Sequence, residues 1–232
     1  MPKSAPPPSE PVHVGRRVVL GLFALAGVGF AVGGSLQRTV NKVASGFNLG
    51  GGFRLYTITG TYPTIRDKDY RLKVEGLVDR PTVYTLADLK ALPSIHMVKT
   101  FQCVTGWTVP DVEWRGVRLS HLLELAGVQE GGHAVTFDSY DGADTESLTI
   151  DQAHLPDVIV AYEMLGKPVT TPHGGPVRLY VAPMFGYKSL KWLSAIRVVP
   201  EVQPGYWEQN GYPTNAWLDG TTGPTDPDPQ LT

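Results

Sequence analysis

Hydrophobic and polar positions alternate along several short stretches of the chain, and this pattern predicts a domain rich in β-strands. Residues 71–78 (RLKVEGLV) show the alternation typical of a half-buried strand. Residues 107–114 contain Pro110 and several polar side chains, so we expect a loop there. Further strands are predicted over residues 95–104, 133–140, 146–150, 158–165, 177–183 and the second half of 190–199.

Two short helices are predicted between these strands. Thr85, with Asp88 three residues later, forms a capping-box pattern in front of a helix over residues 86–92. Ser120 is predicted to cap a second helix over residues 121–126, whose leucines share one face and should pack on a sheet. Strands outnumber helices, and Gly and Pro separate the elements, so the predicted class is α+β with a β-rich mixed sheet.

A separate apolar segment near the N-terminus predicts one hydrophobic helix. Arg16 and Arg17 directly precede an uncharged run rich in Gly, Ala and Val, and this order is typical of a membrane anchor or a twin-arginine export signal. The positive-inside rule then puts the main domain on the extracytoplasmic, periplasmic side. The predicted organisation is a polar lead with twin arginine (1–17), an anchor or signal (18–36), a linker (37–52), a main domain (53–220) and a flexible tail (221–232).

Charge and cysteine content narrow the possible functions. The 232 residues include 20 Lys and Arg against 22 Asp and Glu, spread through the chain, so a nucleic-acid partner is not expected. Cys103 is the one cysteine, which excludes an internal disulfide. It lies where a predicted strand gives way to a turn at Gly106. Cys103 is therefore either a buried space-filling side chain or a working thiolate that ligates a metal.

Two other stretches carry groups that bind anions. His173 precedes two glycines in TPHGGPVRL, and Arg178 stands in an otherwise apolar strand, where it needs an anionic partner. In GYKSLKW, Lys188 and Lys191 flank Ser189 after a glycine, which is typical of a phosphate-binding turn or of an ordinary charged turn. The remaining histidines lack the spacing of zinc ligands.

Three stretches together resemble the oxidoreductase molybdopterin-binding domain of the sulfite oxidase family, over about residues 53–217. They are FQCVTGWTVPDVEWRGVRLSHLLELAGV, DVIVAYEMLGKPVTTPHGGPVRLYVAPMFGYKSLKWLSAIRVV and GYWEQNGYPTNAWLDG. The order of the cysteine, the H-G-x-P-x-R motif and the G-Y-K-S-x-K motif carries the resemblance. It implies a barrel-like sulfite oxidase fold and a molybdenum-molybdopterin cofactor.

The resemblance also implies roles for individual residues. Cys103 matches the thiolate that ligates molybdenum, and His173 and Arg178 match positions that contact the cofactor. The remaining cofactor-binding positions that it implies are Tyr56, Thr57, Ser139, Ser189, Leu190 and Lys191.

The implied activity is two-electron redox chemistry on a small-molecule substrate. The chain is similar to the compact exported bacterial branch, which includes the periplasmic methionine-sulfoxide reductase catalytic subunit, and so oxygen-atom transfer on an S-oxide or N-oxide is expected. Few arginines surround Cys103, which disfavours sulfite. We expect Trp107, Tyr140 and Asp141 near the pocket mouth, the last two handling protons. Electrons would be exchanged with a membrane cytochrome or a soluble carrier.

Two other functions are compatible with the sequence. The chain could be a catalytically idle, membrane-anchored binding domain of the same fold. It could also be a thiol-dependent hydrolase that uses Cys103 and His173.

Overall fold

The structure is a computed structural model that describes residues 52–220. The predictions for the polar lead, the apolar segment 18–36 and the tail 221–232 concern residues outside this range. Within residues 52–220, no helix is both long enough and apolar enough to cross a bilayer.

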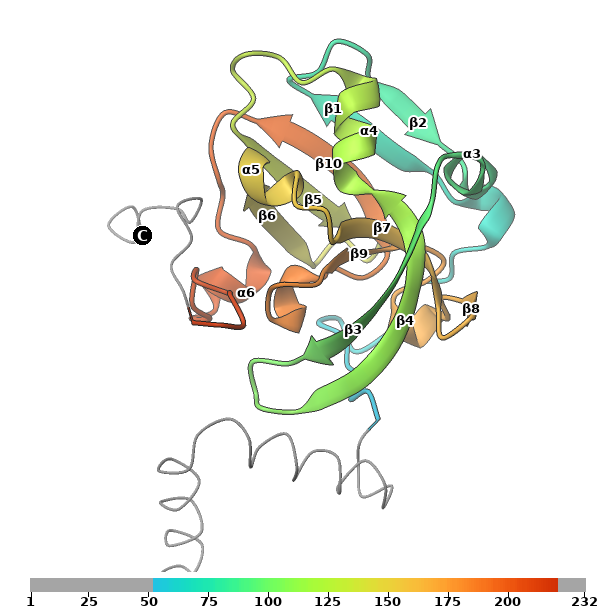
Figure 1. The fold of residues 1–232 in the computed structure, drawn as a ribbon, viewed down its shortest axis with the longest axis vertical. Coiled ribbons are helices and arrows are strands. Elements are labelled where there is room, and N and C mark those ends of the chain that lie inside the picture. The colour runs from blue at the N-terminus through green and yellow to red at the C-terminus, as the bar shows by residue number, and fades with distance from the viewer. Residues whose placement is uncertain (1–51, 221–232) are drawn as a thin grey trace, which may run out of the picture. The chain divides into compact units, whose positions relative to one another are not determined.

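The first sheet has five strands in the order β2-β1-β10-β5-β6 (Figure 1). Strands β1 and β10 pair in parallel, and the other neighbours are antiparallel, so the sheet is mixed as predicted. The bounds are Leu72–Gly76 for β1, Thr82–Tyr84 for β2, Ala134–Ser139 for β5, Thr145–Thr149 for β6 and Leu193–Val199 for β10.

The second sheet is antiparallel and contains the longest strand, β4. One edge of β7 pairs with β4, and the other edge pairs with β8 and β9. In Figure 1, β4 curves strongly beside β3, which gives the sheet a half-barrel curl. The bounds are Ile95–Gln102 for β3, Thr108–Arg118 for β4, Val158–Met164 for β7, Lys167–Pro168 for β8 and Arg178–Val181 for β9.

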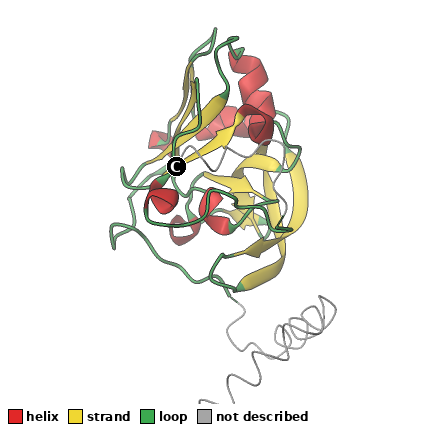
Figure 2. Cartoon of the chain, turned by 90° about the vertical axis from the view of Figure 1, so that its left-hand side faces the viewer, coloured by secondary structure: helices red, strands yellow, loops and turns green. Residues whose placement is uncertain are grey.

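The helices are few and short, which confirms the β-rich class (Figure 2). Thr85 and Asp88 form the predicted capping box in front of α3. The α-helices are α3 (Leu86–Ala91), α4 (Leu119–Ala126), α5 (Ile150–Ala153) and α6 (Tyr206–Gln209), and the 3-10 turns are η1 (Asp67–Asp69), η2 (Thr171–His173) and η3 (Gly186–Lys188).

The predicted start of the second helix is wrong by two residues. Helix α4 begins at Leu119, so Ser120 lies inside the helix. The N-cap residue is Arg118, and its side chain makes no capping hydrogen bond. Strand β4 runs directly into this helix, so tertiary packing and not a capping side chain sets the start. The predicted apolar face is confirmed, because Leu122 and Leu123 are fully buried in the main core.

The predicted loop over residues 107–114 is also wrong, because most of it belongs to β4. Lys99 pairs with Val112 and Phe101 pairs with Val109, so Pro110 and Asp111 together face one residue of β3. This is a β-bulge, where proline is tolerated because its missing N–H is not needed for the ladder. Asp111 has a φ of 53°, which fits the bulge.

At Gly116, strand β4 lies so close to β7 that a side chain would not fit between them. A Cβ at Gly116 would lie 2.2 Å from the Val160 carbonyl oxygen and 2.8 Å from the Ala161 Cα. Both obstacles are backbone atoms of a paired strand, so they cannot move aside without disturbing the ladder.

We therefore predict that Gly116→Ala lowers the free energy of unfolding by about 1–3 kcal/mol, the usual cost of overpacking. Gly131→Ala is the matched control, because its Cβ would lie 3.8 Å from the nearest side-chain atom and should change stability by less than about 0.5 kcal/mol. Urea unfolding of both variants gives the comparison. Equal stability of the two would contradict the close approach of the strands.

Candidate functional site

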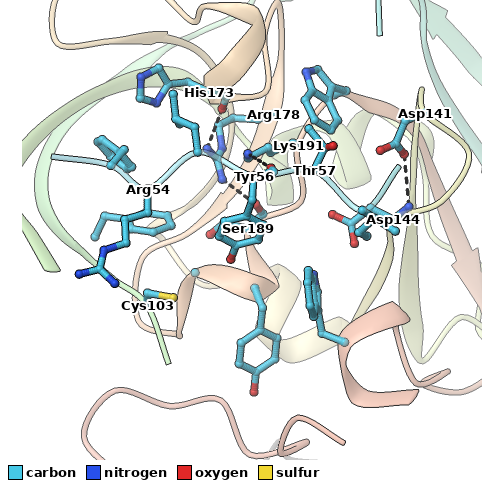
Figure 3. A pocket seen from close by; sticks show the side chains of 18 of the residues that line it. Arg54, Tyr56, Thr57, Cys103, Asp141, Asp144, His173, Arg178, Ser189 and Lys191 are labelled. Carbon is cyan, nitrogen blue, oxygen red and sulfur yellow. Dashed lines mark hydrogen bonds between the residues drawn. The ribbon is translucent and has the colours of Figure 1, made fainter. Parts of the chain in front are cut away.

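A pocket of about 650 Å³, its open mouth included, gathers residues from distant parts of the chain. Its walls come from residues 53–58, the turn after β3, η2, β9, the η3 turn, the β5–β6 turn and α6. Figure 3 shows the segment that carries Tyr56 and Thr57 running across the pocket between Cys103 and the carboxylates of Asp141 and Asp144.

The first end of the pocket holds the thiol of Cys103. Cys103 is 6% exposed and lies in a tight turn. Its backbone N–H donates to the Trp107 carbonyl at 2.9 Å, and its carbonyl accepts from the Gly106 N–H at 3.0 Å. Gly106 has a φ of 92°, a left-handed conformation that glycine adopts without strain. The thiol lies 3.2 Å from the Thr105 hydroxyl.

Aromatic rings form the wall beside this thiol. Phe53 lies 5.2 Å from Phe101 and 6.2 Å from Trp107, between ring centroids, and Phe101 stacks on Trp107 at 5.7 Å. Partial burial, and then the Cys103 thiol, raise the pKa of the nearby Tyr56 to about 12, so its hydroxyl stays protonated at neutral pH. This end of the pocket therefore combines an apolar wall with a neutral tyrosine hydroxyl, and Figure 3 shows the Arg54 side chain on the same side as Cys103.

The centre of the pocket is cationic. Arg178 is 2% exposed, and its guanidinium donates to the His173 carbonyl at 2.7 Å and to the Ser189 carbonyl at 2.6 Å. Burial lowers the pKa of Arg178 to about 10, so it remains charged at neutral pH. Lys191 donates to the Tyr56 carbonyl at 2.9 Å, and burial followed by repulsion from Arg178 lowers its pKa to about 8.

His173 contacts both the aromatic wall, through Phe53, and Arg178, which donates to its carbonyl. Its ring packs edge-on against Phe53 at 4.9 Å, and its Nδ1 is buried without a hydrogen-bond partner among residues 52–220. Burial, and then Arg178 and Lys191, lower its pKa, so the ring is neutral at neutral pH. A neutral ring with an unpartnered nitrogen can hydrogen-bond a ligand.

The far end of the pocket holds two carboxylates in the β5–β6 turn. Asp141 Oδ1 accepts from the N–H groups of Ala143 at 3.0 Å and Asp144 at 3.3 Å. Asp141 Oδ2 and Asp144 Oδ1 are buried and have no hydrogen-bond partner in the described part of the chain. Burial, and then Asp141, raise the pKa of Asp144 to about 7.

The structure brings most of the predicted site residues together. Those that line the pocket are Tyr56, Thr57, Cys103, Asp141, His173, Arg178, Ser189 and Lys191, and Trp107 lines it as well. They come from six separate segments, so the fold and not sequence proximity makes them neighbours.

Three predicted residues do not line the pocket. The Tyr140 hydroxyl accepts from the Arg71 N–H at 2.8 Å and donates to the Arg71 carbonyl at 2.6 Å, so its predicted place at the mouth is wrong. Ser139 is buried and accepts weakly from the Asp141 N–H at 3.4 Å. Leu190 is buried in the core, with its carbonyl accepting from Leu179. In each case the side chain points into the packed interior or a neighbouring strand.

Lys188 differs from its predicted role in the phosphate-binding turn. It is buried and paired with Glu146 and Glu208, and it does not line the pocket. The turn contains the 3-10 turn η3 (Gly186–Lys188), after which Lys188 and Lys191 lie on different sides. Lys191 alone of the two lysines reaches the pocket.

Several pocket residues were not predicted from the sequence. Asp144 follows the Asp-Gly turn signal that drew attention to Asp141, and Trp207 lies in the third of the resembling stretches. Their positions in sequence do not indicate where their side chains point. The other unpredicted lining residues are Phe53, Arg54, Leu55, Ile58, Phe101, Gly186, Tyr187 and Trp192.

Comparison with known proteins identifies similar chains. Residues 59–207 match the family described as the oxidoreductase molybdopterin binding domain. The uncharacterized oxidoreductase YuiH of Bacillus subtilis (strain 168) is 37% identical over 155 residues, covering 66% of this chain and 78% of YuiH. The protein-methionine-sulfoxide reductase catalytic subunit MsrP of Ralstonia nicotianae is 30% identical over 159 residues, covering 62% of this chain and 48% of MsrP.

A solved structure has a similar fold. The sulfane dehydrogenase SoxCD from Paracoccus pantotrophus matches with a TM-score of 0.57 and 25% sequence identity, over 62% of this chain and 41% of that one. The present chain therefore spans about half the length of MsrP and less than half of the SoxCD chain.

The cationic centre predicts binding of inorganic phosphate by the ligand-free full-length chain. Phosphate should raise the melting temperature relative to chloride at equal ionic strength, and Lys191→Met should remove most of this effect. Lys191 is charged below its pKa of about 8, so the stabilisation should fall as the pH rises through this value. Thermal unfolding between pH 6.5 and 9 measures it. Lys167→Met, on the exposed strand β8, is the control, and an equal response of both variants would contradict the site.

Proposed function

The chain belongs to the oxidoreductase molybdopterin-binding domain family, and from this premise we propose that it transfers an oxygen atom from small, neutral S-oxides or N-oxides. The family cofactor is molybdenum-molybdopterin. The observation that carries the proposal is the order of chemical groups along the pocket. A thiol and an aromatic wall lie at one end, two cations at the centre, and at the other end two carboxylates that each have one oxygen without a partner among residues 52–220.

The residues of the pocket fit this cofactor group by group. A molybdenum ion bound by sulfur takes a soft thiolate as a further ligand, and Cys103 supplies it. The phosphate of the cofactor needs cations, and Arg178 and Lys191 line the centre. The pterin ring presents N–H donors, and the orphaned oxygens of Asp141 and Asp144 are buried acceptors without a partner in residues 52–220.

We assign these residues to holding the cofactor. Cys103 would bind the metal, Arg178 and Lys191 the phosphate, and the carboxylates of Asp141 and Asp144 the pterin edge. When bound, the cofactor supplies two-electron redox chemistry. The protein supplies ligation and a water-poor pocket, and the neutral His173 ring adds a hydrogen-bonding group beside the cations.

The overall reaction must balance electrons and protons. An S-oxide, two electrons and two protons give a thioether and one water molecule. The electrons come from a partner, which we propose to be a membrane cytochrome or a soluble carrier; the name of MsrP as a catalytic subunit supports a partner protein. Asp144, with a pKa of about 7, can hold a proton inside the pocket at neutral pH.

The aromatic side chains beside Cys103 favour a neutral substrate over sulfite. Phe53, Phe101 and Trp107 form an apolar wall next to the thiol. The buried guanidinium of Arg178 is assigned to the cofactor phosphate and also donates to the carbonyls of His173, Leu179 and Ser189, so little of its hydrogen-bonding capacity is left for an anionic substrate. An uncharged substrate with an apolar arm matches this wall better than a small dianion does.

The location of the enzyme is part of the proposal. Arg16 and Arg17 followed by an apolar segment support export by the twin-arginine route or anchoring at the membrane, with the domain on the periplasmic side. An anchor would keep the catalytic domain near a membrane-bound electron donor.

The experiment is a substrate screen on molybdenum-loaded full-length protein with an artificial electron donor or acceptor. We expect kcat/KM for methyl phenyl sulfoxide to exceed that for sulfite. Trp107→Ala should raise KM for this sulfoxide about three- to tenfold, because one aromatic contact contributes about 0.5–1.5 kcal/mol. Val98→Ala, at an exposed position of β3, is the control. Preferential oxidation of sulfite would refute the substrate class, and molybdenum-loaded protein inactive on every substrate would support the idle binding domain.

A further inference from the structure

Three charged side chains are buried together beside the pocket. The Lys188 ammonium donates to Glu146 Oε1 and, at 2.7 Å, to Glu208 Oε1. The side chains of Glu146, Lys188 and Glu208 are 1%, 7% and 4% exposed. Glu146 Oε1 also accepts from the Ser147 N–H at 2.7 Å. These residues belong to β6, η3 and α6, so the cluster joins three elements that are distant in sequence.

The charges of this cluster do not balance. Two carboxylates surround one ammonium, and an unpaired negative charge in a buried site is costly. The second oxygen of each carboxyl group, Oε2 of Glu146 and Oε2 of Glu208, is buried without a hydrogen-bond partner among the described residues. A proton on one carboxyl group removes the excess charge and turns one of these orphaned oxygens into a donor.

The cluster is directly connected to two walls of the pocket. Tyr187 and Trp207 line the pocket, and each directly precedes a member of the cluster in sequence. The Trp207 ring contacts Tyr56 at 6.1 Å and Tyr212 at 5.1 Å, and the Tyr187 ring contacts Tyr212 at 5.4 Å. Helix α6 has only four residues, so it depends on tertiary contacts to hold Trp207 in place.

We propose that Glu146, Lys188 and Glu208 form a proton-holding clamp that positions Tyr187 and Trp207 as walls of the pocket. Lys188 is a positioning residue in this assignment, and Lys191 alone of the two lysines contacts the bound anion. Loss of the proton leaves two charged carboxylates on one ammonium and weakens the attachment of α6. The clamp positions the walls of the pocket, so this proposal does not depend on which ligand the pocket binds.

The surrounding groups set the direction of the pH dependence. Lys188 and Glu208 face Glu146 directly, Tyr187 lies next to both carboxyl groups, and Asp144 interacts with Glu208. Burial raises the pKa of Glu146 to about 8, with Lys188 opposing this shift and Glu208 adding to it. The folded chain therefore holds a proton that the unfolded chain releases near pH 4.5. Stability from this group falls as the pH rises from about 5 to 8 and changes little above that.

The test is urea unfolding of the ligand-free full-length chain between pH 5 and 9. The folding equilibrium constant of the wild type, divided by that of Glu146→Gln, should fall by up to about tenfold per pH unit across this window, the effect of one proton. Glu208→Gln should remove the same pH dependence, because one carboxylate then pairs with one ammonium. Glu163→Gln is the control, since Glu163 lies on β7 and pairs with the half-exposed Arg115.

A second measurement reports on the wall of the pocket. The tryptophan emission of the wild type minus that of Trp207→Phe isolates Trp207, and it should change between pH 6 and 9. Glu146→Gln should abolish this change, and Glu163→Gln should leave it. The clamp is overturned if Glu146→Gln and Glu208→Gln both keep the wild-type pH dependence of unfolding. It is equally overturned if the Trp207 signal stays constant over this range in the wild type.

Discussion

The buried guanidinium of Arg178 is the interaction on which the site depends. It is 2% exposed, has no carboxylate ion-pair partner among residues 52–220, and donates to the carbonyls of His173 and Ser189. These two bonds tie η2 and the η3 turn to β9, which sets the floor of the pocket. The guanidinium also lies over the rings of Phe101 and Trp114, 5.8 and 5.5 Å from their centroids. A cation held in this way favours an anion in the pocket, and the phosphate of the cofactor is such an anion.

Local backbone features deliver the other groups to the same place. The tight turn at Gly106 presents the Cys103 thiol at the end of β3, and the bulge at Pro110 and Asp111 lets β4 curve away beyond it. The β5–β6 turn brings Asp141 and Asp144 to the opposite end (Figure 3). The pocket thus has a thiol with an aromatic wall, two cations and two carboxylates in the order in which we propose that the metal, the phosphate and the pterin bind.

Much of this could be predicted from the sequence, for reasons that are physical. The alternation of polar and apolar residues predicted most of the strands, and the capping box predicted α3. The motifs around Cys103, His173 and Arg178 predicted many of the residues that line the pocket. What failed depended on tertiary structure. Pro110 indicates a loop in the sequence, but pairing with β3 accommodates it as a bulge in β4. Lys188 and Lys191 have the same local pattern in the sequence, and only the fold shows that Lys188 pairs with Glu146 of β6. Sequence position alone does not say on which side of a turn a lysine lies.

The central claim is that Cys103 binds the metal of the cofactor, and X-ray absorption at the molybdenum edge tests it most directly. The full-length protein, made in a host that synthesises the cofactor, is compared with Cys103→Ser and with Thr105→Val as a control for the neighbouring hydroxyl. We predict one more sulfur neighbour of molybdenum in the wild type and in Thr105→Val than in Cys103→Ser. Equal numbers of sulfur neighbours in all three proteins, or wild-type protein without molybdenum, would contradict this account.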